Sequence, residues 1–378
     1  MTTTPLAEPR LKIAIVITEL SRGGAEKVGT KLALGLSRRE HQVTAISLKQ
    51  RPEAPRDSLV LELEQAGIEL HFLDQKRGWK ALGAVVPIRR LAIAERFDIV
   101  QTLLHHAGIL GTIGARLAGI TNIVQGIRVS DPRSSVQRID RLMSIAAKRV
   151  VCVSESVRQL AEQTGIPSRK LQTILNGVDF PEAIPAIDRT SLPLPVDAPF
   201  LLSIGRLEPQ KGFAQFLPHL QGVFAQHSNL HWLVAGVGPD QAALAAQAAE
   251  LGIGARVHFL GFRADTFPLI AASEMLVLPS IYEGMPNVVL ETIAAGKALV
   301  ATQTDGIGEI FTGHPYGCEQ VAKSHAEMVP KITKLLSDEP LRNAIGTANQ
   351  LHARERFTWE RMVDEYEQIY REITAPKR

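Results

Sequence analysis

Short apolar runs alternate along this chain with longer stretches in which apolar residues recur every three or four positions. Runs of aliphatic residues predict buried strands, and the longer spacing predicts amphipathic helices. The predicted strands lie at or near residues 12–17, 42–47, 69–73, 98–103, 121–127, 149–153, 200–204, 230–235, 257–260, 275–279 and 298–302. Strands that alternate with helices in this way predict α/β domains, each with a parallel sheet covered by helices on both faces.

A proline-rich stretch separates two series of strands, and 378 residues are enough for two domains. Five prolines and few large apolar residues between 181 and 199 are typical of a linker. We therefore expect an N-terminal domain over residues 1–183, a linker over 184–199 and a C-terminal domain over 200–357. The amphipathic segment 358–378 is expected to return to the first domain.

The composition, 45% hydrophobic and 21% charged, is that of an ordinary globular protein. Only two cysteines, Cys152 and Cys318, are present, which excludes a disulfide framework and is typical of a reducing cytosol. No apolar run approaches the roughly 18–20 residues that span a bilayer, and the first thirty residues do not resemble a signal peptide. We expect a cytoplasmic protein that is soluble or attached to a membrane surface.

Charge is shared unevenly between the two halves. Residues 1–183 carry 26 Lys and Arg against 18 Asp and Glu, whereas the remainder carries 16 against 21. The basic half indicates an anionic partner, either phosphate groups or the anionic cytoplasmic face of a membrane, although a solvated surface explains the same excess. The basic and apolar segment 76–96 could lie on a membrane, but Pro87 interrupts it and favours an ordinary packed helix.

Two strand ends of the first domain carry candidate binding residues. The pair Gly23-Gly24 precedes a helix, where backbone can approach a ligand closely, although a tight turn also explains it. His105 and His106 follow another strand and are well placed to contact a ligand. Adjacent histidines point in different directions, so at most one is expected to be functional. No cysteines or carboxylates cluster around them, so no metal site is predicted.

A basic cluster follows the strand that ends near residue 127. Its members are Arg128, Asp131, Arg133, Arg138 and Arg141. The cluster is compatible with an anionic acceptor and equally with a solvated helix face.

Three successive strand ends of the second domain combine glycine with polar or basic residues. The first loop, from Gly205 to Gly212, contains Arg206 and Lys211, which could hold a diphosphate. The other two strand ends are Gly236-Val237-Gly238 and Gly261-Phe262-Arg263. Each could be a simple turn, but the repetition favours a shared ligand pocket.

The segment Ser280–Glu291 follows the apolar run 275–278 and provides two carboxylates. Gly284 allows a tight turn after the strand, and Pro286 is suited to the first position of a helix. Glu283 then lies in the loop and Glu291 about two turns inside the helix. The two carboxylates could hold the hydroxyls of a polyol, but this spacing also occurs in ordinary strand–turn–helix units.

Taken in order, these motifs resemble the retaining glycosyltransferases of family 4, and the resemblance covers nearly the whole chain. The segments that carry it are Gly23–Glu26, Gly205–Gly212, Gly261-Phe262, Glu283–Glu291 and Phe357–Glu360. The resemblance implies the GT-B fold, with two Rossmann-like parallel-sheet domains facing across a cleft and a C-terminal helix crossing back to the first.

The resemblance also implies roles for individual residues. Arg206 and Lys211 would bind the donor diphosphate and stabilise charge on the leaving group, with Glu283 and His106 beside the donor sugar. The implied catalytic residues are therefore Arg206, Lys211, Glu283 and His106. Glu291 would accept hydrogen bonds from the ribose hydroxyls. The implied donor-binding residues are Gly23, Gly24, Gly238, Arg263, Gly284, Met285, Pro286, Asn287, Val288 and Glu291. The implied acceptor-side residues are His105 and Arg128.

The reaction implied is transfer of a sugar, with retention, from a nucleotide sugar to a hydroxyl of a lipid-linked or polysaccharide acceptor. UDP-sugar is the expected donor, and polysaccharide or lipopolysaccharide biosynthesis the expected context. No cofactor and no metal are expected, since Arg and Lys replace a divalent cation and no DxD motif is present. We expect no nucleic-acid partner. We do expect peripheral contact with the cytoplasmic face of a membrane.

The chain departs from the family pattern at two positions. Leu103 stands where relatives often have a histidine, and Gly308 stands where they have a proline before the glutamate, here Glu309. We expect the loop at Glu309 to be more mobile as a result.

Two alternative functions remain. One is a catalytically degenerate GT-B protein that only binds, against which the intact Arg206, Lys211, Glu283 and Glu291 argue. The other is a sugar-nucleotide 2-epimerase, which needs further acid–base residues that the sequence does not identify.

Overall fold

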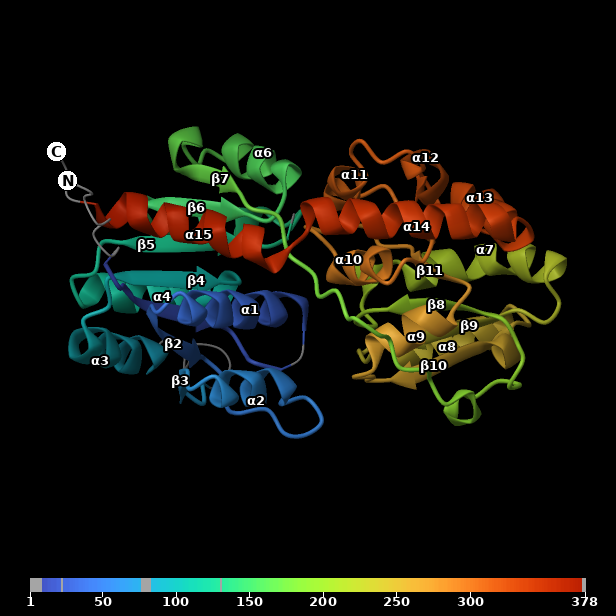
Figure 1. The fold of residues 1–378 in the computed structure, drawn as a ribbon, viewed down its shortest axis with the longest axis horizontal. Coiled ribbons are helices and arrows are strands. Elements are labelled where there is room, and N and C mark those ends of the chain that lie inside the picture. Colours follow the sequence, from blue (N-terminus) through green and yellow to red (C-terminus); the bar gives the residue numbers. More distant parts are fainter. Residues whose placement is uncertain (1–8, 22, 76–82, 130, 376–378) are drawn as a thin grey trace, which may run out of the picture. The chain divides into compact units, whose positions relative to one another are not determined.

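The computed structural model describes residues 9–21, 23–75, 83–129 and 131–375. The chain forms two compact units (Figure 1). Unit 1 comprises Met1–Leu175 and Trp359–Arg378, and unit 2 comprises Asn176–Thr358. The proline-rich residues 184–199 belong to unit 2 in this division, and the chain passes between units at Leu175.

Unit 1 contains a seven-stranded parallel sheet in the order β3-β2-β1-β4-β5-β6-β7. Its strands are β1 (Lys12–Ile17), β2 (Gln42–Ser47), β3 (Glu69–Phe72), β4 (Ile99–Leu103), β5 (Ile123–Ile127), β6 (Arg149–Cys152) and β7 (Leu171–Thr173). Its helices are α1 (Gly24–Arg38), α2 (Ser58–Gln65), α3 (Val85–Glu95), α4 (His105–Leu117), α5 (Ser134–Ala146), α6 (Glu155–Gln163) and α15 (Trp359–Thr374).

Unit 2 contains a six-stranded parallel sheet in the order β10-β9-β8-β11-β12-β13. Its strands are β8 (Phe200–Ile204), β9 (His231–Ala235), β10 (Val257–Gly261), β11 (Met275–Leu278), β12 (Leu299–Thr302) and β13 (Val321–Ala322). Its helices are α7 (Phe213–Gln226), α8 (Gln241–Glu250), α9 (Thr266–Ala272), α10 (Asn287–Ala294), α11 (Asp305–Ile310), α12 (Gly317–Gln320), α13 (His325–Ser337) and α14 (Glu339–Arg356).

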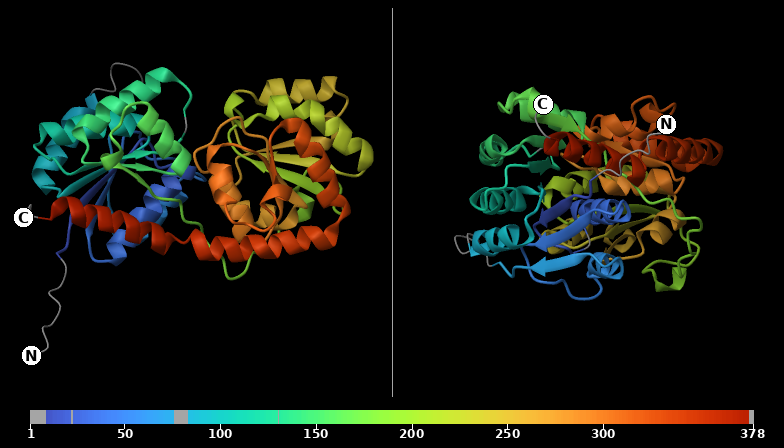
Figure 2. Two further views of the ribbon diagram at one scale, coloured as in Figure 1. Left: turned by 90° about the horizontal axis from the view of Figure 1, so that it is seen from above. Right: turned by 60° about the vertical axis from the view of Figure 1, so that its left-hand side comes forward.

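Helices cover both faces of each sheet, and the central strands are therefore buried on both sides (Figure 2). All four residues of β11 and of β12 are buried, and five of the six residues of β1 are. Strands of this kind read as continuous apolar runs. The predicted parallel α/β fold is confirmed, and the two strands that the sequence analysis missed, β7 and β13, have only three and two residues.

The order of the strands reverses once in each sheet, and this reversal positions the candidate ligand loops. In unit 1, β1 lies between β2 and β4, so Ile17 is level with Leu103 at the carboxyl ends. In unit 2, β8 lies between β9 and β11. Ligands of open α/β sheets bind at such points, where neighbouring loops leave in opposite directions.

Two local expectations from the sequence are wrong. Pro87 does not interrupt a helix, because it lies in the first turn of α3, where the missing N–H has no helical partner in any case. Glu309 lies in α11 and not in a loop. Residues 76–82 of the predicted basic amphipathic segment lie outside the described residues. Within the described ranges, no helix is both long and apolar enough to span a bilayer.

Helix α15 packs into the core of unit 1. Tyr366 and Tyr370 are fully buried, and the Tyr370 hydroxyl donates to Gln101 Oε1 on β4 at 2.9 Å. The helix lies so close to α1 that a Cβ at Gly35 would come within 2.5 Å of Val363. A methyl group at position 35 would not fit between the two helices, so this close packing requires glycine at that position of α1.

An ion cluster holds the outer side of α15 against α1. Glu367 accepts hydrogen bonds from Arg39 at 2.6 Å and from Arg371, and its Oε1 lies 3.2 Å from His41 Nε2. Burial raises the pKa of Glu367, but the bonds from Arg39, Arg371 and His41 outweigh it and bring the pKa to about 2. The carboxylate is therefore charged at any ordinary pH.

We predict that Glu367→Gln lowers the free energy of unfolding by about 2 kcal/mol at pH 7, because two arginines lose a charged partner. Since the pKa of Glu367 is lowered on folding, the unfolded chain takes up this proton first as pH falls. The contribution of Glu367 is therefore present above pH ~4.5 and is lost toward pH 2. Urea unfolding of both proteins at pH 7 and near pH 2 measures this contribution.

The matched control is Glu372→Gln, since Glu372 is 46% exposed and 3.8 Å from Arg149. That substitution is expected to cost under about 1 kcal/mol. Equal effects of the two substitutions at pH 7 would contradict the role given to Glu367.

Candidate functional site

A buried ion pair joins the loops that follow β8 and β11 at the carboxyl edge of the unit 2 sheet. Lys211 Nζ lies 2.6 Å from Glu283 Oε1, and the two side chains are 13% and 7% exposed. Ser280 Oγ donates to the same oxygen at 2.7 Å. The carboxylate is thus fixed through Oε1, and Oε2 accepts no hydrogen bond from another described residue.

Main-chain contacts hold these two loops together. The Ile281 amide donates to Gln210 O at 2.8 Å, and the Gln210 side chain donates to Tyr282 O at 3.0 Å. From α13, His325 Nε2 lies 2.8 Å from Pro279 O. The position of Glu283 relative to Lys211 therefore does not depend on the ion pair alone.

Four glycines at this edge have no room for a side chain. A Cβ on Gly212, whose φ is +67°, would lie 1.9 Å from Pro279 O. A Cβ on Gly236 would lie 1.8 Å from Gly205 O, and one on Gly306 1.8 Å from Gly284 O. At Gly238, a predicted donor-binding residue, it would lie 2.2 Å from Leu207 O. Packing against Leu207 therefore requires glycine at position 238, independently of any bound donor.

Arg206 and Lys211, the two basic residues of the loop after β8, lie in different surroundings. Arg206 is 65% exposed and pairs with Glu208 at 3.0 Å, whereas Lys211 is buried against Glu283. The structure therefore brings Lys211 and Glu283 together but leaves Arg206 at the surface of the same loop. Arg263, after β10, donates to Asp265 Oδ1 at 2.8 Å, and this bond raises its pKa.

The segment from Gly284 to Val288 forms the start of α10. The helix begins at Asn287, with Pro286 before it in an extended conformation, one residue later than the sequence predicts. Asn176 Nδ2 donates to Asn287 Oδ1 at 2.7 Å and fixes this side chain. Met285, Val288 and Glu291 are buried, at 6%, 9% and 9% exposure. Glu283 and Glu291 therefore both lie below the surface of unit 2.

In unit 1, the Gly23-Gly24 pair lies directly at the start of α1, after the carboxyl end of β1. Gly24 is the first helical residue and Gly23 precedes it in an extended conformation. A Cβ on Gly23 would lie 2.4 Å from the Glu26 carboxylate, which is itself buried. Because this carboxylate ends a flexible side chain that can move aside, the contact does not by itself require glycine at position 23.

The two adjacent histidines follow β4, beside a strained residue. Leu104 has φ +72° and ψ 156°, a conformation that a branched side chain rarely adopts. His105 Nδ1 lies 3.1 Å from Asp140 Oδ1 on α5. For His106, burial followed by the charges of His105 and Lys49 lowers the pKa. The carboxylate partner thus belongs to His105, whereas the sequence analysis assigned the catalytic role to His106.

Arg128 is buried and stands apart from the other members of its predicted basic cluster. Burial lowers its pKa, while the Tyr366 hydroxyl on α15 and the Glu26 carboxylate counteract this. Arg133 instead pairs with Asp131 at the surface. The cluster is therefore not one patch, and Arg128 links the loop after β5 to α1 and α15.

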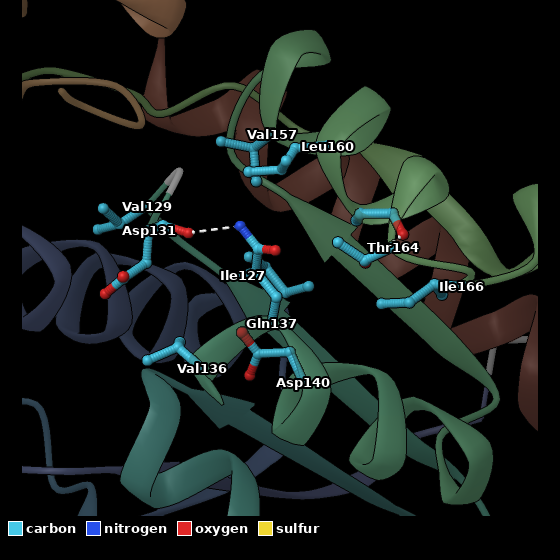
Figure 3. Close-up of a pocket in the computed structure, with 11 residues that line it drawn as sticks. Ile127, Val129, Asp131, Val136, Gln137, Asp140, Val157, Leu160, Thr164 and Ile166 are labelled. Atoms are coloured by element: carbon cyan, nitrogen blue, oxygen red, sulfur yellow. Dashed lines mark hydrogen bonds between the residues drawn. The ribbon is translucent and has the colours of Figure 1, made fainter. Parts of the chain in front are cut away.

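A narrow pocket lies between α5 and α6 above β5 (Figure 3). Figure 3 shows Ile127, Val157 and Leu160 on its apolar side, with Asp131, Gln137 and Asp140 on its polar side. Its free volume of about 20 Å³ holds about one water molecule. A sugar would enter this pocket only if side chains moved.

No group of three His, Cys, Asp or Glu residues that could hold a metal ion occurs within the described part of the chain. Cys152 is buried, and burial raises its pKa to about 12, so it does not provide a thiolate.

Several residues that hold these sites were missed by the sequence analysis. Ser280 stands three positions before Glu283, so its proximity could have been inferred from the loop itself. Asp140, Asn176 and His325 lie far along the chain from the groups that they contact, and no local pattern marks them.

Two family models match the chain. The model described as Glycosyltransferase Family 4 matches residues 22–181. The model described as Glycosyl transferases group 1 matches residues 186–352. The two matches fall on consecutive parts of the chain and overlap at no residue.

Curated relatives agree with these models. The UDP-Gal:alpha-D-GlcNAc-diphosphoundecaprenol alpha-1,3-galactosyltransferase of Escherichia coli is 28% identical over 244 residues, 60% of this chain and 63% of that protein. The aligned part thus spans less than two thirds of that relative. An uncharacterized glycosyltransferase of Methanocaldococcus jannaschii is 26% identical over 392 residues, 96% of this chain and 98% of that protein.

Solved structures share the fold. Anabaena Alr3699/HepE, in complex with UDP-glucose, matches with a TM-score of 0.80 and 21% identity, over 95% of this chain and 100% of that chain. Sucrose-phosphate synthase from Thermosynechococcus elongatus matches with a TM-score of 0.79 and 17% identity, over 96% and 99%. Identities this low establish the common architecture only.

We predict that Gly212→Ala lowers the free energy of unfolding of the protein by about 3 kcal/mol or more, because the added methyl meets Pro279 O at a left-handed position. Gly252→Ala is the matched control: its φ is +71° and no atom lies within 4 Å of its Cβ position. The control is expected to cost about 1 kcal/mol. Thermal unfolding of both variants measures their losses of stability. Equal losses would show that the contact with Pro279 O is not the cause.

Proposed function

Since the chain belongs to the family 4-type glycosyltransferases of the GT-B fold, we propose that it transfers a sugar from a UDP-sugar to a hydroxyl of a lipid-linked or polysaccharide acceptor. The anomeric configuration is retained in this proposal, and no metal ion takes part. The observation that carries it is the buried Lys211–Glu283 pair at the carboxyl edge of the unit 2 sheet.

Lys211 can serve a diphosphate without giving up Glu283. An ammonium group has three N–H donors, and the contact with Glu283 uses one of them. The other two remain for oxygens of the donor diphosphate, and the exposed Arg206 guanidinium adds a second cation from the same loop. Two positive charges at this position stabilise the charge that develops on the leaving UDP.

Glu283 is suited to orienting the donor sugar. Its Oε1 is occupied by Lys211 and Ser280, which leaves Oε2 to accept hydrogen bonds from sugar hydroxyls. The main-chain N–H groups of Gly284, Met285, Asn287 and Val288, at the start of α10, provide further donors. Glu291, two turns into α10, is assigned to the ribose hydroxyls, and the turn at Gly261–Arg263 to the base.

The chemistry needs few groups from the protein. The bond between the anomeric carbon and the UDP phosphate breaks, and the sugar becomes oxocarbenium-like. The acceptor hydroxyl attacks from the same face, and its proton passes to the leaving phosphate. The products are the glycosylated acceptor and UDP.

Acceptor-side residues are assigned to unit 1. His105, fixed by Asp140, and Arg128 are the candidates. Gly23 and Gly24, in the loop after β1, remain assigned to the donor. A lipid-linked acceptor on the cytoplasmic membrane face is supported by the basic first half and by the E. coli relative, whose name specifies a diphosphoundecaprenol acceptor. The UDP donor is supported by the same name and by the UDP-glucose complex of Alr3699/HepE.

We predict that a UDP-sugar raises the thermal unfolding temperature of the protein, whereas GDP- and ADP-sugars do not. A donor at a hundred times its dissociation constant adds about 2.7 kcal/mol to stability by mass action. A thermal-shift screen of nucleotide sugars measures this directly. A response to GDP-sugars alone would exclude the proposed donor, and no response to any would oppose nucleotide-sugar binding.

We predict that Lys211→Ala lowers kcat of transfer by about 10²–10³-fold, as expected when a cation that stabilises a leaving group is lost. Lys323→Ala, which removes an exposed lysine of unit 2, is the control and should leave kcat unchanged.

Because Lys211→Ala leaves Glu283 buried without its cation, the variant Lys211→Gln with Glu283→Gln tests folding separately. Full transfer activity in a folded Lys211→Ala protein would exclude the proposed role, and it would leave a catalytically degenerate binding protein as the better description.

A further inference from the structure

The residue at which the chain enters unit 2 contacts the start of α10, although it has no part in the proposed reaction. Asn176 is the first residue of unit 2, and only 2% of its surface is exposed. It lies 111 residues before Asn287 in the sequence. Its contact with α10 is therefore made by the fold and is not a feature of either local segment.

Three hydrogen bonds join Asn176 to the turn that leads into α10. Its Nδ2 donates to Asn287 Oδ1 at 2.7 Å and to Met285 O at 3.5 Å, and its main-chain N–H donates to Met285 Sδ at 3.3 Å. A side-chain amide nitrogen carries two N–H donors. One asparagine side chain therefore holds both ends of the turn Met285–Asn287.

The segment of Asn176 is itself fixed to unit 2 independently of α10. Two residues further along, the Val178 amide donates to Phe357 O at 2.8 Å, just after the end of α14. The guanidinium of Arg354, in the last turn of α14, lies 5.1 Å from the centre of the Phe180 ring. The contacts of Asn176 with the turn thus start from an anchored stretch of backbone.

A second remote segment, the start of α11, packs against the same turn. A Cβ on Gly306 would lie 1.8 Å from Gly284 O and 2.9 Å from Met285 Cα. The first N–H groups of a helix have no partner inside it, and Pro286, which precedes α10, has no side chain that could accept from them. The direction of these N–H groups therefore depends on how the turn is held.

That direction matters for the donor sugar. The N–H groups of Met285, Asn287 and Val288 are among those assigned to it above, and hydrogen bonds weaken steeply when the donor points away from its acceptor. The cations assigned to the diphosphate, Arg206 and Lys211, lie on a different loop. A shift of the turn would therefore affect the sugar more than the nucleotide.

We propose that Asn176 is a positioning residue for the donor sugar. It holds the turn Met285–Asn287 so that the N–H groups at the start of α10 are directed at the sugar before the donor binds. Asn176 acts through Met285 and Asn287 and makes no contact with the donor itself. The inference rests on the proposed function, since it assumes a nucleotide sugar at this edge of unit 2.

Isothermal titration calorimetry tests the proposal with two probes, UDP and whichever of UDP-glucose and UDP-galactose binds the wild-type protein more tightly. Asn176→Ala should weaken binding of the UDP-sugar about tenfold, as when one or two hydrogen bonds are lost, and binding of UDP less than about twofold. A loss of folding alone lowers the fraction of protein that binds, but it leaves the ratio of the two dissociation constants unchanged.

Two further variants keep the test decisive if Asn176→Ala does not fold. Asn176→Asp has the same size and leaves no cavity, but its ionised side chain has no N–H donor, so it should weaken UDP-sugar binding by at least as much. Asn287→Ala removes one partner from a half-buried position. Because Asn176 acts partly through Asn287, the double variant N176A/N287A should weaken binding by less than the product of the two single effects.

The matched control is Asn349→Ala, which removes another buried asparagine of unit 2. Asn349 is fully buried on α14, and its Nδ2 donates to Lys297 O and to Gln320 Oε1, both at 2.8 Å. Its loss should lower the thermal unfolding temperature and leave both dissociation constants unchanged. A purely structural role for Asn176 would give the same pattern.

Three results would overturn the proposal: unchanged UDP-sugar binding by folded Asn176→Ala and Asn176→Asp, equal weakening of UDP and UDP-sugar, or the same change in the Asn349→Ala control. Failure of the proposed function looks different, because the wild-type protein would then bind neither UDP nor a UDP-sugar, and this inference would fall with it. Wild-type binding with an unchanged ratio in the Asn176 variants refutes the positioning role alone.

Discussion

Side-by-side pairing of β8 with β11 is the constraint on which the donor side depends. These strands are more than 70 residues apart in the sequence, and only their pairing places the loop of Lys211 against the loop of Glu283. The same reversal of strand order occurs beside β1 in unit 1, where the glycine pair and the histidines follow neighbouring strands. The order of the strands in each sheet thus brings the candidate site residues together. The local sequence determines only which side chains lie at these positions.

Burial of charge shapes both units. A lysine or carboxylate removed from water needs a partner, and breaking a buried pair costs far more than breaking an exposed one. Lys211 and Glu283 satisfy each other, and so do the members of the Glu367 cluster on α15. Arg128 is stabilised less completely, by a hydroxyl and a buried carboxylate from two other elements. Docking of α15 therefore affects the loop after β5 as well as the hydrophobic core of unit 1.

Much of the fold is predictable from the sequence, because strands buried on both faces leave continuous apolar runs and glycines mark their ends. The motif segments around Lys211 and Glu283 were identified for the same reason. Strands of two or three residues, β7 and β13, carry too few positions to show any period. The exposure of Arg206, the choice of His105 as the partner of Asp140, and the isolation of Arg128 depend on contacts between distant segments. Such contacts leave no mark on the local pattern.

The glycine contacts at the carboxyl edge of unit 2 have a consequence for protein engineering. Gly212, Gly236 and Gly306 each place backbone against a carbonyl oxygen, at distances that no side chain tolerates. Libraries aimed at a new donor sugar should therefore keep these positions constant and vary the side chains between them. Randomising whole loops would fill such a library mostly with unfolded proteins, and screening would then report folding yield in place of selectivity.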